Sequence, residues 1–222
     1  MKITGAIFDM DGTLVDSLFF WNRFWEKLGI KYFDDPEYMP PEYVDKYVRT
    51  SMLTEAGDFL HSELKIGENM EELAEFLVSD IADFYRYEVD FKPGARKFLD
   101  FCRKKGIKMC VASATSSNIL KIASQALGFD EYFEFVMSCD EVGRGKDEPD
   151  VYVEALKRLG TEPETTWIFE DSYVALETAS KLGISTVGIF DKWNFDHDKL
   201  NQKSVFYIDE DETMEKLICE IE

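Results

Sequence analysis

The chain has 222 residues, 45% of them hydrophobic and 32% charged, which is enough to form one large domain or one domain with a sizeable insertion. Asp and Glu number 45 against 25 Lys and Arg, so the formal net charge is -20. A surface this acidic repels nucleic acid and anionic lipid, and we expect neither as a partner.

The four cysteines form no C-x-x-C pair and show no zinc-like spacing (Cys102, Cys110, Cys139 and Cys219). The N-terminus turns acidic too soon for a signal peptide. No apolar run reaches the ~20 residues that span a bilayer. These features predict a protein of the reducing cytoplasm.

The first predicted element is a buried strand over residues 3–8, which ends in two closely spaced carboxylates. Asp9 and Asp11 follow the strand, and Gly12 comes directly after them. A tight turn with aspartates bonded to backbone amides is one explanation. A calcium loop of the EF-hand kind is excluded, because its glycine would stand at the sixth position and here it stands at the fourth.

Residues 17–89 contain no convincing strand, and their pattern predicts helices over 17–28, about 41–64 and 68–88. Three prolines between positions 36 and 41 separate the first two helices. We therefore expect a helical insertion over 17–89. The aromatic side chains of its first helix are expected to pack in a core. The alternative is that one or two of them, with Asn22 or Arg23, face the leaving group of a substrate.

Residues 90–222 alternate short apolar runs with amphipathic stretches, which is typical of βα units around a parallel sheet. Strands are predicted at 107–112, near 134–137, at 166–169 and at 185–190, and helices at 116–127, 149–159 and 172–182. Pro93 would begin a further helix that Gly106 ends.

Three helices of this part end in Leu-Gly, where glycine allows the left-handed turn that stops a helix (Gly128, Gly160 and Gly183). The tail predicts an edge strand and an amphipathic helix, with the acidic residues 209–212 at the start of that helix. The expected fold class is α/β: a doubly wound, mostly parallel Rossmann-like sheet formed by 1–16 and 90–222, with an inserted α-helical domain over 17–89.

Three further polar clusters each follow a strand or precede a helix. Hydroxyl residues 113–117 follow the strand at 107–112, Lys146 precedes the helix at 149–159, and Glu170 and Asp171 follow the strand at 166–169. Carboxyl ends of parallel strands meet at one edge of a sheet, so we expect one site there. Its carboxylates would hold Mg²⁺, its lysine and hydroxyls would hold a phosphoryl group, and one carboxylate would attack it.

The chain resembles the haloacid dehalogenase-like (HAD) hydrolases, in the helical-cap subfamily that includes phosphoglycolate phosphatase-like and β-phosphoglucomutase-like enzymes. The resemblance lies in FDMDGTLVDS, VASA, the lysine before PD, and FEDS, which span residues 3–190 in the family's order. Two positions depart from the family pattern: Asp147 stands where the first proline of Lys-Pro-x-Pro-Asp is usual, and Ala175 replaces a common glycine.

The resemblance implies a Mg²⁺-dependent phosphatase acting on a small phosphorylated metabolite, with the insertion at 17–89 as its α-helical cap domain. Asp9 would be the nucleophile that becomes an aspartyl-phosphate, and Asp11 the acid and base. Mg²⁺ would be held by Asp9, the backbone carbonyl of Asp11, and Asp171, with Glu170 supporting these ligands. The phosphoryl group would be bound by Ser113, the Ala114 amide and Lys146, with Thr13 orienting the loop.

Several alternatives stay open. A sugar phosphomutase would use the same core, and Arg49 is the nearest match to its cap arginine, without the usual neighbouring glycine. A dehalogenase is disfavoured by Asp11, and a phosphonatase would need a cap lysine in a matching motif, which none of the candidates has (Lys27, Lys31, Lys46 and Lys65). A non-catalytic phosphometabolite-binding protein is disfavoured by the intact acidic set and Lys146.

Some features receive no functional role. Arg49 and Arg86 could anchor an anion, but exposed surface charge is the favoured interpretation of each. His61 and His197 have no metal-like partner in the sequence. We expect a monomer, with a dimer as the alternative.

Overall fold

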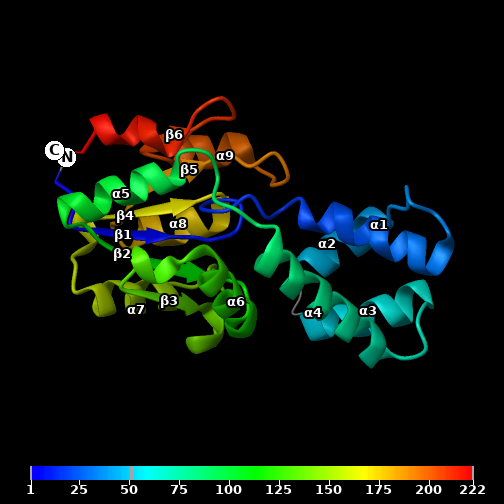
Figure 1. Cartoon of the computed structure of the whole chain (residues 1–222). Helices are drawn as coiled ribbons and strands as arrows, with labels where there is room; N and C mark the ends of the chain where they lie inside the picture. Colours follow the sequence, from blue (N-terminus) through cyan, green and yellow to red (C-terminus); the bar gives the residue numbers. More distant parts are fainter. Residues whose placement is uncertain (1, 51–52, 222) are drawn as a thin grey trace. The chain divides into compact units, whose positions relative to one another are not determined.

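The computed structural model describes residues 2–50 and 53–221, without the side chains of 50, 53 and 54. The chain divides into two compact units (Figure 1): Met1–Leu18 with Val89–Glu222, and Phe19–Glu88. The first is an α/β unit and the second is helical. That the helical unit serves as a cap stays a prediction.

The α/β unit is built on a six-stranded sheet in which every pair is parallel, in the order β3-β2-β1-β4-β5-β6. The strands are β1 Gly5–Phe8, β2 Lys108–Ser113, β3 Phe135–Ser138, β4 Thr166–Glu170, β5 Ser185–Ile189 and β6 Phe206–Ile208. The expected fold class, a doubly wound parallel sheet, is confirmed.

The two central strands are buried along their whole length, which explains their continuous apolar sequence. Their side chains alternate between the two faces of the sheet. Ile7 and Ile168 pack in the core under α7 Asp150–Leu159 and α8 Tyr173–Lys181. On the other face, Phe8 stacks on Phe169 with ring centroids 4.2 Å apart, and both meet Phe98 of α5 Ala95–Lys105.

The register places the carboxyl ends of the strands at one level. Phe8 pairs with Val111 of β2 and Phe169 of β4, and Ser113 pairs with Ser138 of β3. The segments that leave β1, β2, β3 and β4 therefore start from the same edge, where α/β sheets bind their ligands.

The helices of the α/β unit end as glycine positions predict. α6 Ser117–Leu127 and α7 end at Gly128 and Gly160, and Gly183 follows α8; their φ angles are +69°, +64° and +84°. α5 Ala95–Lys105 ends at Gly106, as expected. Its start differs, because Gly94 takes the N-cap position and Pro93 precedes the helix.

The C-terminal part differs further from expectation. α9 His197–Lys203, before β6, was not predicted. The tail helix is a 3₁₀ helix, Met214–Cys219, with Thr213 at its N-cap. Within the acidic run before it, Glu212 pairs with Lys216 at 2.7 Å. None of the helices in the described residues combines the length and apolar character needed to cross a bilayer.

The helical unit contains α1 Phe20–Phe33, α2 Glu42–Thr50, α3 Leu53–Leu64 and α4 Met70–Tyr87. The helix predicted over 41–64 is thus α2 and α3, and residues 51–52 between them lie outside the described residues. Gly57 of α3 lies against Ala74 of α4 so closely that a Cβ at Gly57 would stand 2.6 Å from the Ala74 Cα. This contact lets the two helices pack together.

Three of the aromatic residues of α1 form a core, as predicted, while Trp21 is partly buried. Phe20, Phe24 and Trp25 are buried, and Phe20 meets Phe84 of α4 with ring centroids 5.2 Å apart. These three side chains are therefore packing residues.

Candidate active site

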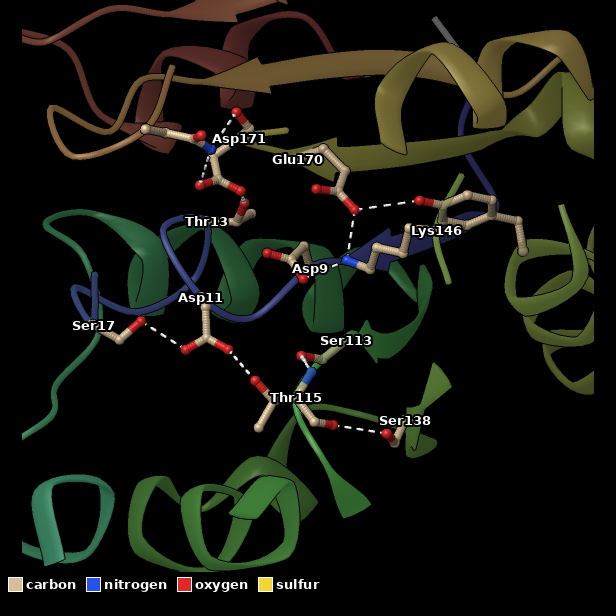
Figure 2. Close-up of polar contacts among 12 residues, drawn as sticks. Asp9, Asp11, Thr13, Ser17, Ser113, Thr115, Ser138, Lys146, Glu170 and Asp171 are labelled. Carbon is tan, nitrogen blue, oxygen red and sulfur yellow. Dashed lines mark hydrogen bonds and ion pairs between the residues drawn. The ribbon is translucent and has the colours of Figure 1, made fainter. Parts of the chain in front are cut away.

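Figure 2 shows one polar cluster at the carboxyl edge of the sheet. Asp9 follows β1, Ser113 ends β2, and Glu170 and Asp171 lie at the end of β4. Lys146 reaches the same place from the segment before α7. The four sequence motifs thus supply side chains to one site, which is where the parallel topology was expected to bring them.

Lys146 joins two carboxylates at the centre of the cluster. Its ammonium donates to Asp9 Oδ1, and to Glu170 Oε1 at 2.6 Å. The side chains of Lys146, Asp9 and Glu170 are only 10%, 9% and 1% exposed. The Tyr152 hydroxyl of α7 donates to the same Glu170 oxygen at 3.4 Å. This lysine is therefore part of the buried site and not a surface residue.

Burial and charge shift the pKa values of this group together. Burial disfavours the charged ammonium, but the charges of Asp9 and Glu170 outweigh it and hold the pKa of Lys146 well above its ordinary value. Burial raises the pKa of Glu170 to about 8 despite Lys146, and it also raises the pKa of Asp9. Asp147, which stands where the family usually has a proline, is exposed and leaves the pairing of Lys146 with Asp9 and Glu170 intact.

A divalent metal fits the carboxylates of this site. Carboxylate oxygens of Asp9, Glu170 and Asp171 lie within 4.8 Å of one another, and all three residues are buried. Burial and the neighbouring Asp9 and Glu170 raise the pKa of Asp171 well above its ordinary value. Hard oxygen donors with excess negative charge are the ligands that Mg²⁺ prefers.

The turn after β1 requires glycine at position 12 for two reasons. Gly12 has a φ of +72°, which favours residues without a Cβ. A Cβ at this position would also stand 2.8 Å from Asp171 Cγ and 2.9 Å from Leu18 Cδ1. Thr13, the next residue, is fully buried, and its hydroxyl donates to Asp171 Oδ1 at 3.4 Å. This turn and the end of β4 therefore pack as one unit.

Asp11 lies apart from the three grouped carboxylates. Its Oδ1 accepts a hydrogen bond from the Ser17 hydroxyl at 2.6 Å, and its Oδ2 accepts one from the Thr115 hydroxyl at 2.6 Å. Figure 2 shows its side chain directed away from Asp171 and toward Ser17 and Thr115. The two aspartates of the first motif thus have different surroundings: Asp9 pairs with a lysine, and Asp11 with two hydroxyls.

The segment after β2 presents polar groups beside Asp9. The Thr115 amide donates to Ser113 Oγ at 3.0 Å, and the Thr115 carbonyl accepts from the Ser138 hydroxyl at 2.7 Å. Because Ser113 Oγ accepts from this amide, its own proton can point elsewhere. Ser116 stands at the N-cap of α6, but its side chain makes no cap hydrogen bond to the helix.

Sequence reasoning missed four members of the site: Ser17, Ser138, Tyr152 and Asn194. Asn194, in the segment after β5, donates to Asp171 Oδ2 at 2.7 Å and to the Asp171 carbonyl at 2.9 Å. Ser17 stands six residues after Asp11 within the quoted motif, so its position offered a signal. Asn194 follows no recognisable pattern.

The expectation that Arg49 is an exposed surface charge is wrong. Its side chain is 15% exposed, its Nε lies 2.8 Å from both carboxylate oxygens of Asp45, and its Nη2 donates to Asn22 at 3.0 Å. Asp45 and Arg49 are four residues apart on one helix, so their side chains lie on the same face and can form this ion pair. Arg86 is 43% exposed and pairs with Asp83, as an ordinary surface charge does.

Comparisons with known proteins agree with this fold. The sequence model of a family described as haloacid dehalogenase-like hydrolase matches residues 3–183. The chain is 28% identical over 186 residues to the phosphorylated carbohydrates phosphatase of Thermotoga maritima, covering 82% of each chain. It is 26% identical over 199 residues to hexitol phosphatase A of Escherichia coli, covering 85% of this chain and 84% of that protein.

A solved structure shows the same architecture. The crystal structure of a putative β-phosphoglucomutase from Thermotoga maritima superposes with a TM-score of 0.74 at 26% identity, covering 93% of this chain and 94% of the other. The enzyme class expected from the sequence, a phosphatase of the HAD type, is confirmed by these relatives. The chain therefore belongs to the haloacid dehalogenase-like hydrolases.

Proposed function

We propose that this enzyme is a Mg²⁺-dependent phosphatase that hydrolyses a small phosphorylated metabolite through an aspartyl-phosphate on Asp9. The observation that carries the proposal is the position of Asp9, which pairs with the Lys146 ammonium and has a carboxylate oxygen within 4.8 Å of those of Glu170 and Asp171. A carboxylate placed there has both a cation and the candidate metal ligands close to it. Both would lower the repulsion that a phosphate dianion meets as it approaches.

In the first step Asp9 attacks phosphorus. A bond forms between an Asp9 oxygen and phosphorus, and the bond from phosphorus to the leaving oxygen breaks, with its electron pair passing to that oxygen. Asp11 donates a proton to the leaving oxygen. Lys146 and the Ser113 hydroxyl, with the Ala114 amide, hold the phosphoryl oxygens and stabilise their charge.

In the second step Asp11 acts as a base. It takes a proton from water, whose oxygen attacks phosphorus, and the bond to Asp9 breaks to release phosphate and the free carboxylate. The hydroxyls of Ser17 and Thr115, which donate hydrogen bonds to Asp11, would keep its carboxyl group in the same position through both steps. Thr13 orients the turn.

Asp9, the Asp11 carbonyl and Asp171 would hold Mg²⁺, with Glu170 supporting them through its bond to Lys146. When bound, the ion neutralises charge on the phosphoryl group and on the attacking carboxylate. Glu170 also offers a carboxylate oxygen within 4.8 Å of those of Asp9 and Asp171, so it is a further candidate ligand of the ion.

The relatives suggest the class of substrate. One is named for phosphorylated carbohydrates and another for hexitol phosphates. We propose a phosphorylated sugar or sugar alcohol for this chain, with the helical unit carrying the residues that select it. The acidic net charge of -20 agrees with a small substrate and not a polyanion.

A sugar phosphomutase is the second candidate. The similarity to a structure titled as a putative β-phosphoglucomutase favours it, as does Arg49, a largely buried guanidinium in the helical unit. Arg49 is already bound by Asp45 and Asn22, which leaves fewer of its donors for a substrate phosphate. A mutase would isomerise a sugar phosphate without releasing phosphate.

A substrate screen separates the two. The purified chain would be incubated with Mg²⁺ and p-nitrophenyl phosphate, hexose and hexitol phosphates, short phosphorylated acids and both anomers of glucose 1-phosphate. We expect phosphate release that EDTA stops and that Asp9→Asn abolishes. Isomerisation without free phosphate would favour the mutase, and no turnover of any ester would refute the phosphatase.

A further inference from the structure

The segment after β5, residues 190–196, brings one side chain onto Asp171. The amide nitrogen of Asn194 donates two hydrogen bonds to that residue, one to carboxylate Oδ2 at 2.7 Å and one to the backbone carbonyl at 2.9 Å. Asp171 is 5% exposed, so a donor from the protein replaces water at this oxygen. Asn194 lies 23 residues beyond Asp171 and belongs to none of the four motifs.

The hydrogen-bond pattern fixes which end of the Asn194 amide faces Asp171. Both Asp171 atoms are acceptors, so only the NH₂ group can bind them. The amide oxygen accepts from the Phe195 backbone N–H at 2.8 Å. A flipped amide would set oxygen against oxygen and NH₂ against N–H. The donor is therefore committed to Asp171.

The segment that carries Asn194 is itself tied down. Asp191 Oδ2 pairs with the Lys92 ammonium at 2.7 Å, its Oδ1 accepts from the Trp193 N–H at 2.9 Å, and its carbonyl accepts from the Asn194 N–H at 3.0 Å. The side chains of Asp191 and Lys92 are 4% and 15% exposed. Lys92 also donates to the Phe190 carbonyl at 3.0 Å. Movement of Asn194 would break this buried group of bonds.

The Asp171 carboxylate needs such a partner because the two carboxylates beside it repel it. Asp9 and Glu170 bring their carboxylate oxygens within 4.8 Å of it, and the Thr13 hydroxyl is a more distant donor at 3.4 Å. A short bond from Asn194 fixes the orientation of the carboxylate against this repulsion. Groups that orient a metal ligand in this way commonly change metal affinity by 10–100-fold when they are removed.

We propose that Asn194 is a positioning residue that sets the affinity of this enzyme for Mg²⁺ through its bond to Asp171. The inference rests on the proposed function, in which Asp171 is a metal ligand. Asn194 acts on the ligand and not on the phosphoryl group, so its loss should weaken metal binding and leave the chemical step intact once the metal is saturating.

The test measures Mg²⁺ binding directly. Isothermal titration calorimetry of Mg²⁺ into the full chain would compare the wild type with Asn194→Leu, which has a similar shape, and with the smaller Asn194→Ala. We expect the Kd to rise about 10–100-fold in both. Turnover of p-nitrophenyl phosphate should return near the wild-type kcat at saturating Mg²⁺. Asn201→Ala, an exposed asparagine of α9, is the matched control and should leave the Kd unchanged.

Three results would count against the proposal. A Kd within about twofold of the wild type in both variants would overturn it. So would a lower melting temperature in EDTA with an unchanged Kd, which would make Asn194 a residue of loop structure alone. Absence of Mg²⁺ binding by the wild type would instead refute the proposed metal site, on which the inference depends.

Discussion

Lys146→Gln removes the cation that Asp9 and Glu170 share while keeping a side chain of similar shape. The ammonium lies 2.6 Å from Glu170 Oε1, where an effective dielectric constant of ~20 gives an attraction of about 6 kcal/mol. Desolvation of these buried groups offsets part of it, and loss of one partner from a buried pair costs about 3–5 kcal/mol. We expect the metal-free variant to lose about 3–5 kcal/mol of unfolding free energy at pH 8.

The loss should depend on pH, because the remaining carboxylates can take up protons. The pKa of Glu170 is about 8 in the folded protein, above its ordinary value of 4.5. The folded state therefore binds the proton more tightly, and the associated stability is present below 4.5 and is lost as pH rises through about 8. At pH 5 the protonated carboxyl needs no cation, so the variant should lie closer to the wild type.

Urea denaturation in EDTA, followed by tryptophan fluorescence, measures these differences. Lys157→Gln is the matched control, because Lys157 is 76% exposed and pairs with Glu154 at 3.1 Å. It should cost less than ~1 kcal/mol. A Lys146→Gln variant within ~1 kcal/mol of the wild type at pH 8 would refute the buried charge cluster as described.

Three further changes test other contacts. Thr115→Val keeps the shape of the side chain but removes the hydrogen bond that its hydroxyl donates to Asp11. We expect a loss of about 0.5–1.5 kcal/mol in transition-state stabilisation, measured as kcat/KM, and an unchanged value would contradict it. Gly12→Ala should destabilise the fold more than Gly106→Ala. Both glycines have a left-handed φ, but only at Gly12 do other atoms lie within 4 Å of the added Cβ. Equal unfolding free energies of the two variants would contradict this. Mg²⁺ should raise the melting temperature more at pH 8.5 than at pH 5.5, because the raised pKa values of Glu170 and Asp171 make protons compete with the ion at low pH. Scanning calorimetry with EDTA as the reference measures this difference. An equal or larger rise at pH 5.5 would contradict the prediction.

The sequence predicted the sheet and the meeting of its motifs because both depend on short-range signals. Continuous apolar runs mark β1 and β4, and the polar residues directly after them lie at one edge by topology alone. Leu-Gly pairs located the ends of two helices for the same reason. Asp9, Lys146 and Asp171 could thus be placed in one site before any contact was known.

Contacts between distant segments could not be predicted in this way. Asn194 reaches Asp171 because the Lys92–Asp191 pair holds the segment after β5, and no local pattern reports that pair. Arg49 looked like a surface charge because its bond to Asn22 joins two helices. Such positions depend on how elements pack, which the amphipathic pattern of each element does not specify.

The most direct test of the central claim is to trap the phosphoryl group on Asp9. The enzyme would be mixed with a ³²P-labelled substrate and Mg²⁺, quenched in acid during turnover, and digested for mass spectrometry. The proposed mechanism predicts label on the peptide that carries Asp9. Hydroxylamine should remove this label, because it cleaves acyl phosphates, and the label should be absent from Asp9→Asn. Turnover without label on that peptide, or label that persists in Asp9→Asn, would contradict it.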